Sequence, residues 1–163
     1  MSKKRKTTEE RGKYKIAISR ALYKNEDIRN LIVGDCTTLS ANESRTKFKS
    51  RVKSHLFIDD TITETGSYIF YDINIPSLAS QIKTCRIVMY IICSRDILET
   101  YSKEGYYGDR ADILSQMIED TLINDKEIVN EFGIGELRLD SIEIYNSSRF
   151  YGCIMNFEIP TFR

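Results

Sequence analysis

The most continuously apolar stretch of the chain runs from Cys85 to Cys93, and no charged residue follows Arg86 within it. Alternate side chains of a β-strand point to opposite faces of the sheet, and here both sets of positions are apolar. The pattern therefore predicts a central strand that is covered on both sides. Each large apolar side chain contributes roughly 1.5 to 3 kcal/mol when it is buried, so this strand can anchor a core.

Apolar residues recur at helical spacing in two other parts of the chain. A capping box at Thr7 predicts the start of an amphipathic basic helix that extends to about residue 23, and residues 25–33 repeat the pattern. A second apolar stripe begins near Asp109 and extends to Leu122. Asp109 suits a helix start, since its carboxylate can accept hydrogen bonds from free N–H groups there.

Alternation of apolar and polar residues predicts four more strands. The alternation is weak over residues 52–58 and clear over residues 66–75. It is also clear over residues 137–145 and 150–159, which are separated by a four-residue turn and therefore predict a β-hairpin.

The order helix, strand, strand, strand, helix, strand, strand favours the α+β class. We expect a single, mostly antiparallel or mixed sheet of about four to five strands with two helices packed on it, plus the basic N-terminal helix. With 163 residues, 41% of them hydrophobic, the chain suits one domain over residues 7–163 after a basic tail over residues 1–6. Its parts are an N-terminal helical part (7–33), a polar loop or arm (35–51) and an α/β core (52–163).

Charge is distributed unevenly along the chain, although the sum is zero. Residues 1–53 hold 15 Lys and Arg residues against 6 Asp and Glu, and residues 54–163 hold 9 against 18. One interpretation is that these charges lie on solvated surfaces. The other is that the basic part contacts an acidic surface of a neighbouring copy, or nucleic acid.

The composition argues against a metal site, an export signal and a membrane span. The four cysteines, at positions 36, 85, 93 and 153, have no short metal-binding spacing, and His55 is the one histidine. Three of these cysteines fall in strand patterns, which is typical of core thiols in a protein that folds in the cytosol. The chain has no run of about 18 to 20 apolar residues, so we expect no membrane association.

One pattern resembles a magnesium-dependent nuclease. Asp72 on a strand is followed by Gln81-Ile82-Lys83 at the next strand, where such enzymes place metal-binding carboxylates and a lysine. A second carboxylate is missing. Asp59, Asp60 and Glu64 likewise lack the spacing of a calcium loop. We therefore expect no enzyme, and we assign no catalytic, cofactor-binding or metal-binding residue.

Two passages carry a resemblance to a known family. They are Tyr106-Tyr107-Gly108-Asp109-Arg110-Ala111-Asp112-Ile113-Leu114 and Phe132-Gly133-Ile134-Gly135-Glu136-Leu137. Together with the order of elements from Val52 to Arg163, they resemble the tail terminator and neck-completion proteins of long-tailed bacteriophages, which join heads to tails. The basic N-terminal segment and the 35–51 arm are not explained by this resemblance.

The resemblance implies a structural virion protein of the tail or neck, made in the host cytoplasm. In that family a small α/β subunit forms a ring, commonly a hexamer, that caps the tail tube and stops its polymerisation. The implied partners are further copies of the chain, the tail tube protein and any sheath, head connector or stopper proteins, and genomic double-stranded DNA in the lumen.

A ring requires that one surface of each subunit meets a different surface of the next, and an uneven charge distribution suits that geometry. We expect the basic first helix or the 35–51 arm to contact an acidic face of a neighbouring copy, or the next ring. Three alternatives remain: another neck protein such as a connector or stopper, a DNA-binding accessory protein, and the nuclease. The candidate interface residues are Lys47, Lys49, Arg51, Asp59, Asp60, Glu64, Arg95, Glu104, Tyr106 and Tyr107.

Overall fold

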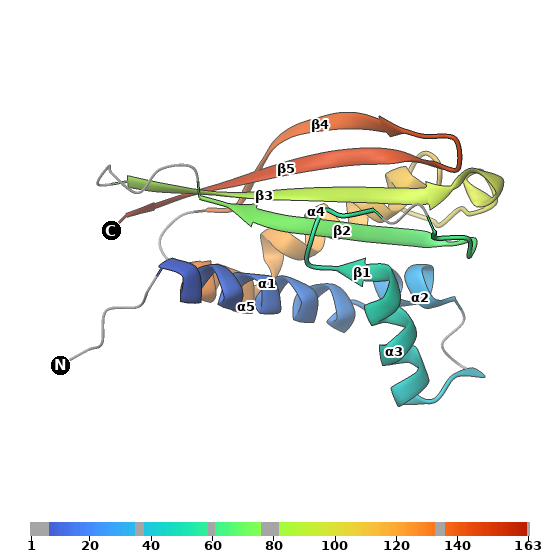
Figure 1. Cartoon of the computed structure of the whole chain (residues 1–163), viewed down its shortest axis with the longest axis horizontal. Helices are drawn as coiled ribbons and strands as arrows, with labels where there is room; N and C mark the ends of the chain where they lie inside the picture. Colours follow the sequence, from blue (N-terminus) through green and yellow to red (C-terminus); the bar gives the residue numbers. More distant parts are fainter. Residues whose placement is uncertain (1–6, 35–37, 59–60, 76–81, 133–135, 163) are drawn as a thin grey trace.

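The protein consists of a five-stranded mixed sheet with helices packed on it (Figure 1). The structure is a computed structural model that describes residues 7–34, 38–58, 61–75, 82–132 and 136–162. This fold confirms the predicted α+β class. The predicted basic tail, residues 1–6, lies outside the described residues. The elements are α1 (Thr7–Lys24), α2 (Glu26–Val33), α3 (Ala41–Arg51), β1 (Val52–Lys53), β2 (Ser67–Asn74), β3 (Ile82–Ser94), the 3-10 turn η2 (Arg95–Ile97), α4 (Arg110–Asn124), α5 (Lys126–Phe132), β4 (Arg138–Asn146) and β5 (Phe150–Phe162).

The strands lie in the order β1-β2-β3-β5-β4, so β3 is the central strand, as predicted. β1 pairs with β2 in parallel, and all other pairs are antiparallel. The predicted hairpin is also confirmed, with the Ser147 N–H donating to the Phe150 carbonyl at 2.9 Å. Gly152 of β5 is required where the strands meet, because a Cβ there would lie 1.9 Å from the Ile91 carbonyl oxygen.

The main core lies between the sheet and the helices. Ile87, Met89 and Ile91 of β3 are fully buried on this side, where Leu114 and Ile118 of α4 also pack. The other face has a smaller cluster of Tyr68, Phe70, Ile92 and Phe150. Val88 and Tyr90 on that face are only half-buried, so the expectation of full cover on both faces of β3 holds for one face and in part for the other.

Helix α3 corrects the prediction of a polar loop over residues 35–51. Ser40 and Glu43 form a capping box: the Ser40 hydroxyl accepts from the Glu43 N–H, and the Glu43 carboxylate accepts from the Ser40 N–H. The helix has no apolar stripe, since Phe48 is its one buried apolar residue. The spacing of apolar residues could not predict this helix, whereas the capping box at Ser40 could have predicted its start.

Two strands differ in length or regularity from their prediction. The strand expected over residues 52–58 is limited to Val52 and Lys53, while β2 matches the prediction closely. In β4, Leu139 pairs with Phe157 and Ser141 pairs with Asn156, so Asp140 is an extra residue that forms a β-bulge.

Candidate interaction surfaces

Three of the candidate interface residues lie on α3, and their environments differ. Lys49 is exposed and Lys47 is half-buried, but Arg51 is only 6% exposed. The Arg51 guanidinium donates to the Ile32 carbonyl at 2.7 Å and to the Glu64 carboxylate at 2.8 Å, and it lies over the Tyr68 ring. Arg51 therefore ties α2 and the loop that contains Glu64 to α3 within the subunit.

Glu64 and Arg95 come together at one end of the sheet, where they line a polar cavity of about 380 Å³. Arg95 donates from Nε to the Ser147 carbonyl at 2.9 Å and also contacts the Asn146 side chain. Its guanidinium thus stabilises the turn between β4 and β5. Asp59 and Asp60 lie outside the described residues.

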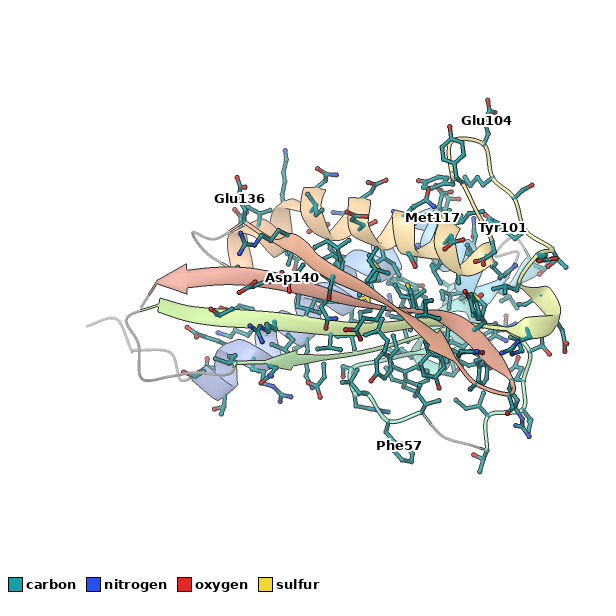
Figure 2. All side chains as sticks on the ribbon, turned by 90° about the horizontal axis from the view of Figure 1, so that it is seen from above. Phe57, Tyr101, Glu104, Met117, Glu136 and Asp140 are labelled. Atoms are coloured by element: carbon teal, nitrogen blue, oxygen red, sulfur yellow. The ribbon has the colours of Figure 1, made fainter. Side chains whose placement is uncertain are left out.

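The loop before α4 carries the remaining predicted residues. Figure 2 shows Glu104 at the tip of this loop, pointing away from the helices. Tyr107 is 80% exposed, and Gln116 holds its backbone by accepting from its N–H and donating to its carbonyl. Tyr106 instead packs against the main core. Glu104 and Tyr107 are accessible for contacts with another molecule, and Tyr106 is largely not.

A second cavity, of about 320 Å³, lies between α1 and α3. Its lining includes Arg20 and Tyr23 of α1 together with Arg45 and Lys49 of α3. The Arg45 guanidinium lies 5.7 Å from the centre of the Tyr23 ring, a cation–π distance. Ile16, one turn before Arg20, is 53% exposed. We call these five residues the basic face.

Helical spacing explains why the basic face is continuous. Residues three or four positions apart lie on the same side of a helix, which groups Ile16, Arg20 and Tyr23 on α1. The same rule groups Arg45 and Lys49 on α3. Edge-to-face packing of Tyr23 on Phe48, with ring centres 5.0 Å apart, holds the two helices together at this point.

Strand β4 presents a surface of opposite charge. Asp140 and Glu143 are exposed, and neither makes an ion pair or side-chain hydrogen bond within the described part of the chain. Ile142 and Ile144 beside them are 58% and 76% exposed. No described strand pairs with the outer side of β4. We call Asp140, Ile142, Glu143 and Ile144 the acidic edge.

The register explains why these isoleucines are exposed. Ile69, Ile91, Cys153 and Ile144 form one row across β2, β3, β5 and β4, so all four face the helix side of the sheet. Ile69 and Ile91 are fully buried there, whereas Ile144 is mostly exposed. The helix layer therefore ends before it reaches β4.

Asp72, the centre of the nuclease hypothesis, is held by cations of α1. Its carboxylate lies 2.5 Å from the Arg11 guanidinium and 2.8 Å from the Lys15 ammonium, and it accepts from the Ile73 N–H. Partial burial alone would raise the pKa of Asp72, but the hydrogen bonds from Lys15 and Ile73 and the nearby positive charges lower it below its usual value.

Other groups required for metal or thiol chemistry are not assembled within the described residues. Among these residues no three His, Cys, Asp or Glu side chains are placed to hold a metal ion. Gln81 lies outside them, and the Lys83 side chain is not described. Burial raises the pKa of the Cys93 thiol to about 11 and also raises that of Cys153, so both thiols stay protonated at neutral pH.

Sequence reasoning missed Arg20, Arg45 and the acidic edge. The capping box at Ser40 was the available signal for α3, and with that helix assigned, Arg45 and Lys49 fall on one side of it. For Ile142 and Ile144 no local signal exists, because alternation is the same in a covered strand and an uncovered one.

Within the described residues, no helix is long and apolar enough to cross a membrane.

Comparison with known proteins places the chain in a family. No curated protein matches the chain. The family model described as YomW matches residues 17–159, which extend from the middle of α1 almost to the end of β5. The chain belongs to the YomW family.

Proposed function

We propose that this protein is a structural virion subunit that assembles head to tail into a ring, as the tail terminators of long-tailed bacteriophages do. The ring caps the tail tube at its head-proximal end, stops tube polymerisation and joins the tail to the head connector, with double-stranded DNA in its lumen. The observation that carries the proposal is the presence of a basic face and an acidic edge at different places on one subunit.

The charge arrangement supports a heterologous contact. In a two-fold dimer one patch meets its own copy, and that patch cannot include both the basic face and the acidic edge, because α3 and β4 lie at opposite sides of the subunit. A patch with only one of these surfaces would be repelled by its copy. Two surfaces of opposite sign favour contacts in which each subunit uses both. Such contacts close into a ring when a whole number of the rotations that relate one subunit to the next adds up to one full turn.

A DNA-binding accessory protein is the second candidate, because Arg20, Arg45 and Lys49 around one cavity also suit phosphate groups. The acidic edge has no role in that function. The nuclease has less support, since the Asp72 carboxylate is already engaged by Arg11 and Lys15.

The native mass of the purified protein tests the proposal. Mass photometry and light scattering over a range of protein and salt concentrations should give a closed species near six times 18.9 kDa. Its population should fall as salt rises, because salt screens charges at the subunit contact. A monomer at every concentration, together with salt-sensitive binding of double-stranded DNA, would favour the second candidate instead.

A second measurement addresses the role in the tail. Adding the protein to polymerising tail tube protein from the same virus should shorten the tubes, and electron microscopy should show one ring at one end of each tube. Tubes of unchanged length without rings would contradict the assignment to the tail, even if the protein forms a ring alone.

A further inference from the structure

We propose that the acidic edge of one copy docks on the basic face of the next, with the Asp140 and Glu143 carboxylates at the cavity between α1 and α3. This inference rests on the proposed ring, and it names the two surfaces that form the subunit contact. The occupant of the basic face is thus a second copy of this chain.

The charges of the two surfaces are complementary and available. Arg45 and Lys49 have no carboxylate partner among the described residues, and Arg20 pairs with Glu127 at 3.3 Å in an exposed contact that contributes little. The carboxylates of Asp140 and Glu143 are likewise unpaired within the described part of the chain. Docking would place each set of charges opposite its counterpart, which favours association and fixes its orientation.

The apolar residues of the two surfaces are also complementary. On the acidic edge, Ile142 and Ile144 face the helix side of the sheet and are 58% and 76% exposed, whereas Glu143 between them faces the other side. On the basic face, Ile16 is 53% exposed, and the half-buried Tyr23 ring lines the cavity. Covering the two isoleucines removes apolar area from water.

The position of the two surfaces excludes contact within one subunit. β1, which directly follows α3, lies at one edge of the sheet, and β4 lies at the other. Figure 1 shows β4 at the top of the molecule and α3 at the bottom. Each copy therefore offers one surface to each of two neighbours, as a ring requires.

The bulge at Asp140 favours docking through side chains over extension of the sheet. It interrupts the regular pairing of β4 between Leu139 and Ser141 and twists the strand at that point. A bulged edge with charged residues is a poor template for a long added strand. The same bulge places an exposed carboxylate on the edge.

Two double variants reverse the charge of one surface each. The basic-face variant carries Arg45→Glu and Lys49→Glu, and the acidic-edge variant carries Asp140→Lys and Glu143→Lys. Each variant alone then has like charges on both docking surfaces. At a protein concentration where the wild type is fully assembled, we expect each variant to lose at least tenfold in assembled fraction by mass photometry.

An equimolar mixture of the two variants provides the direct test of pairing. The reversed, now negative, face of the basic-face variant can dock on the reversed, now positive, edge of the acidic-edge variant. The unchanged basic face of the second variant can dock on the unchanged acidic edge of the first, as in the wild type. The mixture should therefore recover assembly with the two variants in equal amounts, which native mass spectrometry can resolve.

Matched controls reverse exposed charges outside both surfaces. Lys126→Glu on α5 and Glu99→Lys before α4 each change an exposed residue and should assemble like the wild type. The circular dichroism spectrum of every variant should match that of the wild type, since all these substitutions are at exposed positions. Thermal unfolding is compared at a protein concentration where the wild type is monomeric, because loss of assembly alone lowers the melting temperature.

The outcomes separate this inference from the proposed function. If the wild type assembles and either double variant assembles equally well alone, the docking surfaces are wrong while the ring stands. Failure of the folded mixture to assemble would also overturn the pairing. A wild type that never associates would overturn both proposals. Normal assembly of the basic-face variant with loss of DNA binding would assign the cavity to phosphate groups.

Discussion

The two edges of the sheet differ in length, cover and charge. At one edge β1 has only two residues, and the buried Arg51 just before it is hydrogen-bonded to the Ile32 carbonyl and the Glu64 carboxylate. Farther along β2, beyond its pairing with β1, Arg11 and Lys15 of α1 contact Asp72. At the other edge β4 has nine residues, and it exposes two isoleucines and two carboxylates that have no partner among the described residues.

The difference shows that the place of a residue in the sheet, more than its type, sets its role. Ile91 and Ile144 lie in the same cross-strand row and face the same side, yet one is fully buried and the other is 76% exposed. In the same way, Lys47 and Arg51 are one helical turn apart on α3, and only Arg51 is enclosed. Substitutions at such matched positions test the comparison directly.

The largest expected effect is at the centre of the sheet. Ile91→Asp buries an unpaired charge in the main core and should cost at least about 4 kcal/mol of unfolding free energy, which is most of the stability of a domain at the low end of the usual range of about 5 to 15 kcal/mol. Circular dichroism and urea unfolding measure it. A cooperatively folded Ile91→Asp protein would show that β3 is not the centre of the core.

The second prediction concerns Arg51 at the β1 edge of the sheet. Arg51→Met removes the donors that satisfy the Ile32 carbonyl and the Glu64 carboxylate, and should lower the unfolding free energy by about 2 kcal/mol. The control Lys47→Met, one turn away, should change it by less than about 0.5 kcal/mol. Equal effects in urea unfolding would mean that Arg51 does not hold the edge.

The third prediction uses pH at the same edge. The pKa of Asp72 is lowered in the folded state, so its ion pairs stabilise the fold at a pH above the unfolded pKa of about 4, and this contribution is lost as the pH falls through the folded pKa. Asp72→Asn should therefore cost about 1 kcal/mol at pH 7 and less at pH 3. Urea unfolding at both values checks this, and a pH-independent difference would exclude the ionic contribution.

The smallest effect on stability is expected at the open edge. Ile144→Asp should change the unfolding free energy by less than about 0.5 kcal/mol, because the side chain is already mostly in water. A loss near that of Ile91→Asp would show that β4 is covered in the isolated subunit, and the contrast between the edges would disappear.

Part of this architecture could be predicted because its signals are local. The apolar run of β3, the alternation in β2 and β5 and the stripe of α4 each reflect burial of that element itself. The start of α4 was also predictable, since Asp109 and Asp112 cap each other's backbone within one turn.

The proposed docking surfaces and the contacts of Arg51 could not be predicted, because they depend on distant parts of the chain. Arg51 looks like any other cation of α3 until the Ile32 carbonyl is known to lie beside it. Ile144 has the same sequence pattern as a core residue, and only the extent of the helix layer makes it exposed. The basic face likewise needs α1 and α3, which are separated by α2, to be packed side by side.

The pairing of β3 with β5 has a consequence for how the protein is made. All 13 residues of β3 pair with β5, yet residues 95–149 separate the two strands in the chain. While the ribosome is synthesising the protein, β2 and β3 emerge long before β5, so one side of the most apolar strand stays unpaired until β5 has been added. Termination between Ser94 and Phe150 should therefore yield fragments that expose the unpaired side of β3 and aggregate, and slow translation of residues 95–149 should prolong this exposure.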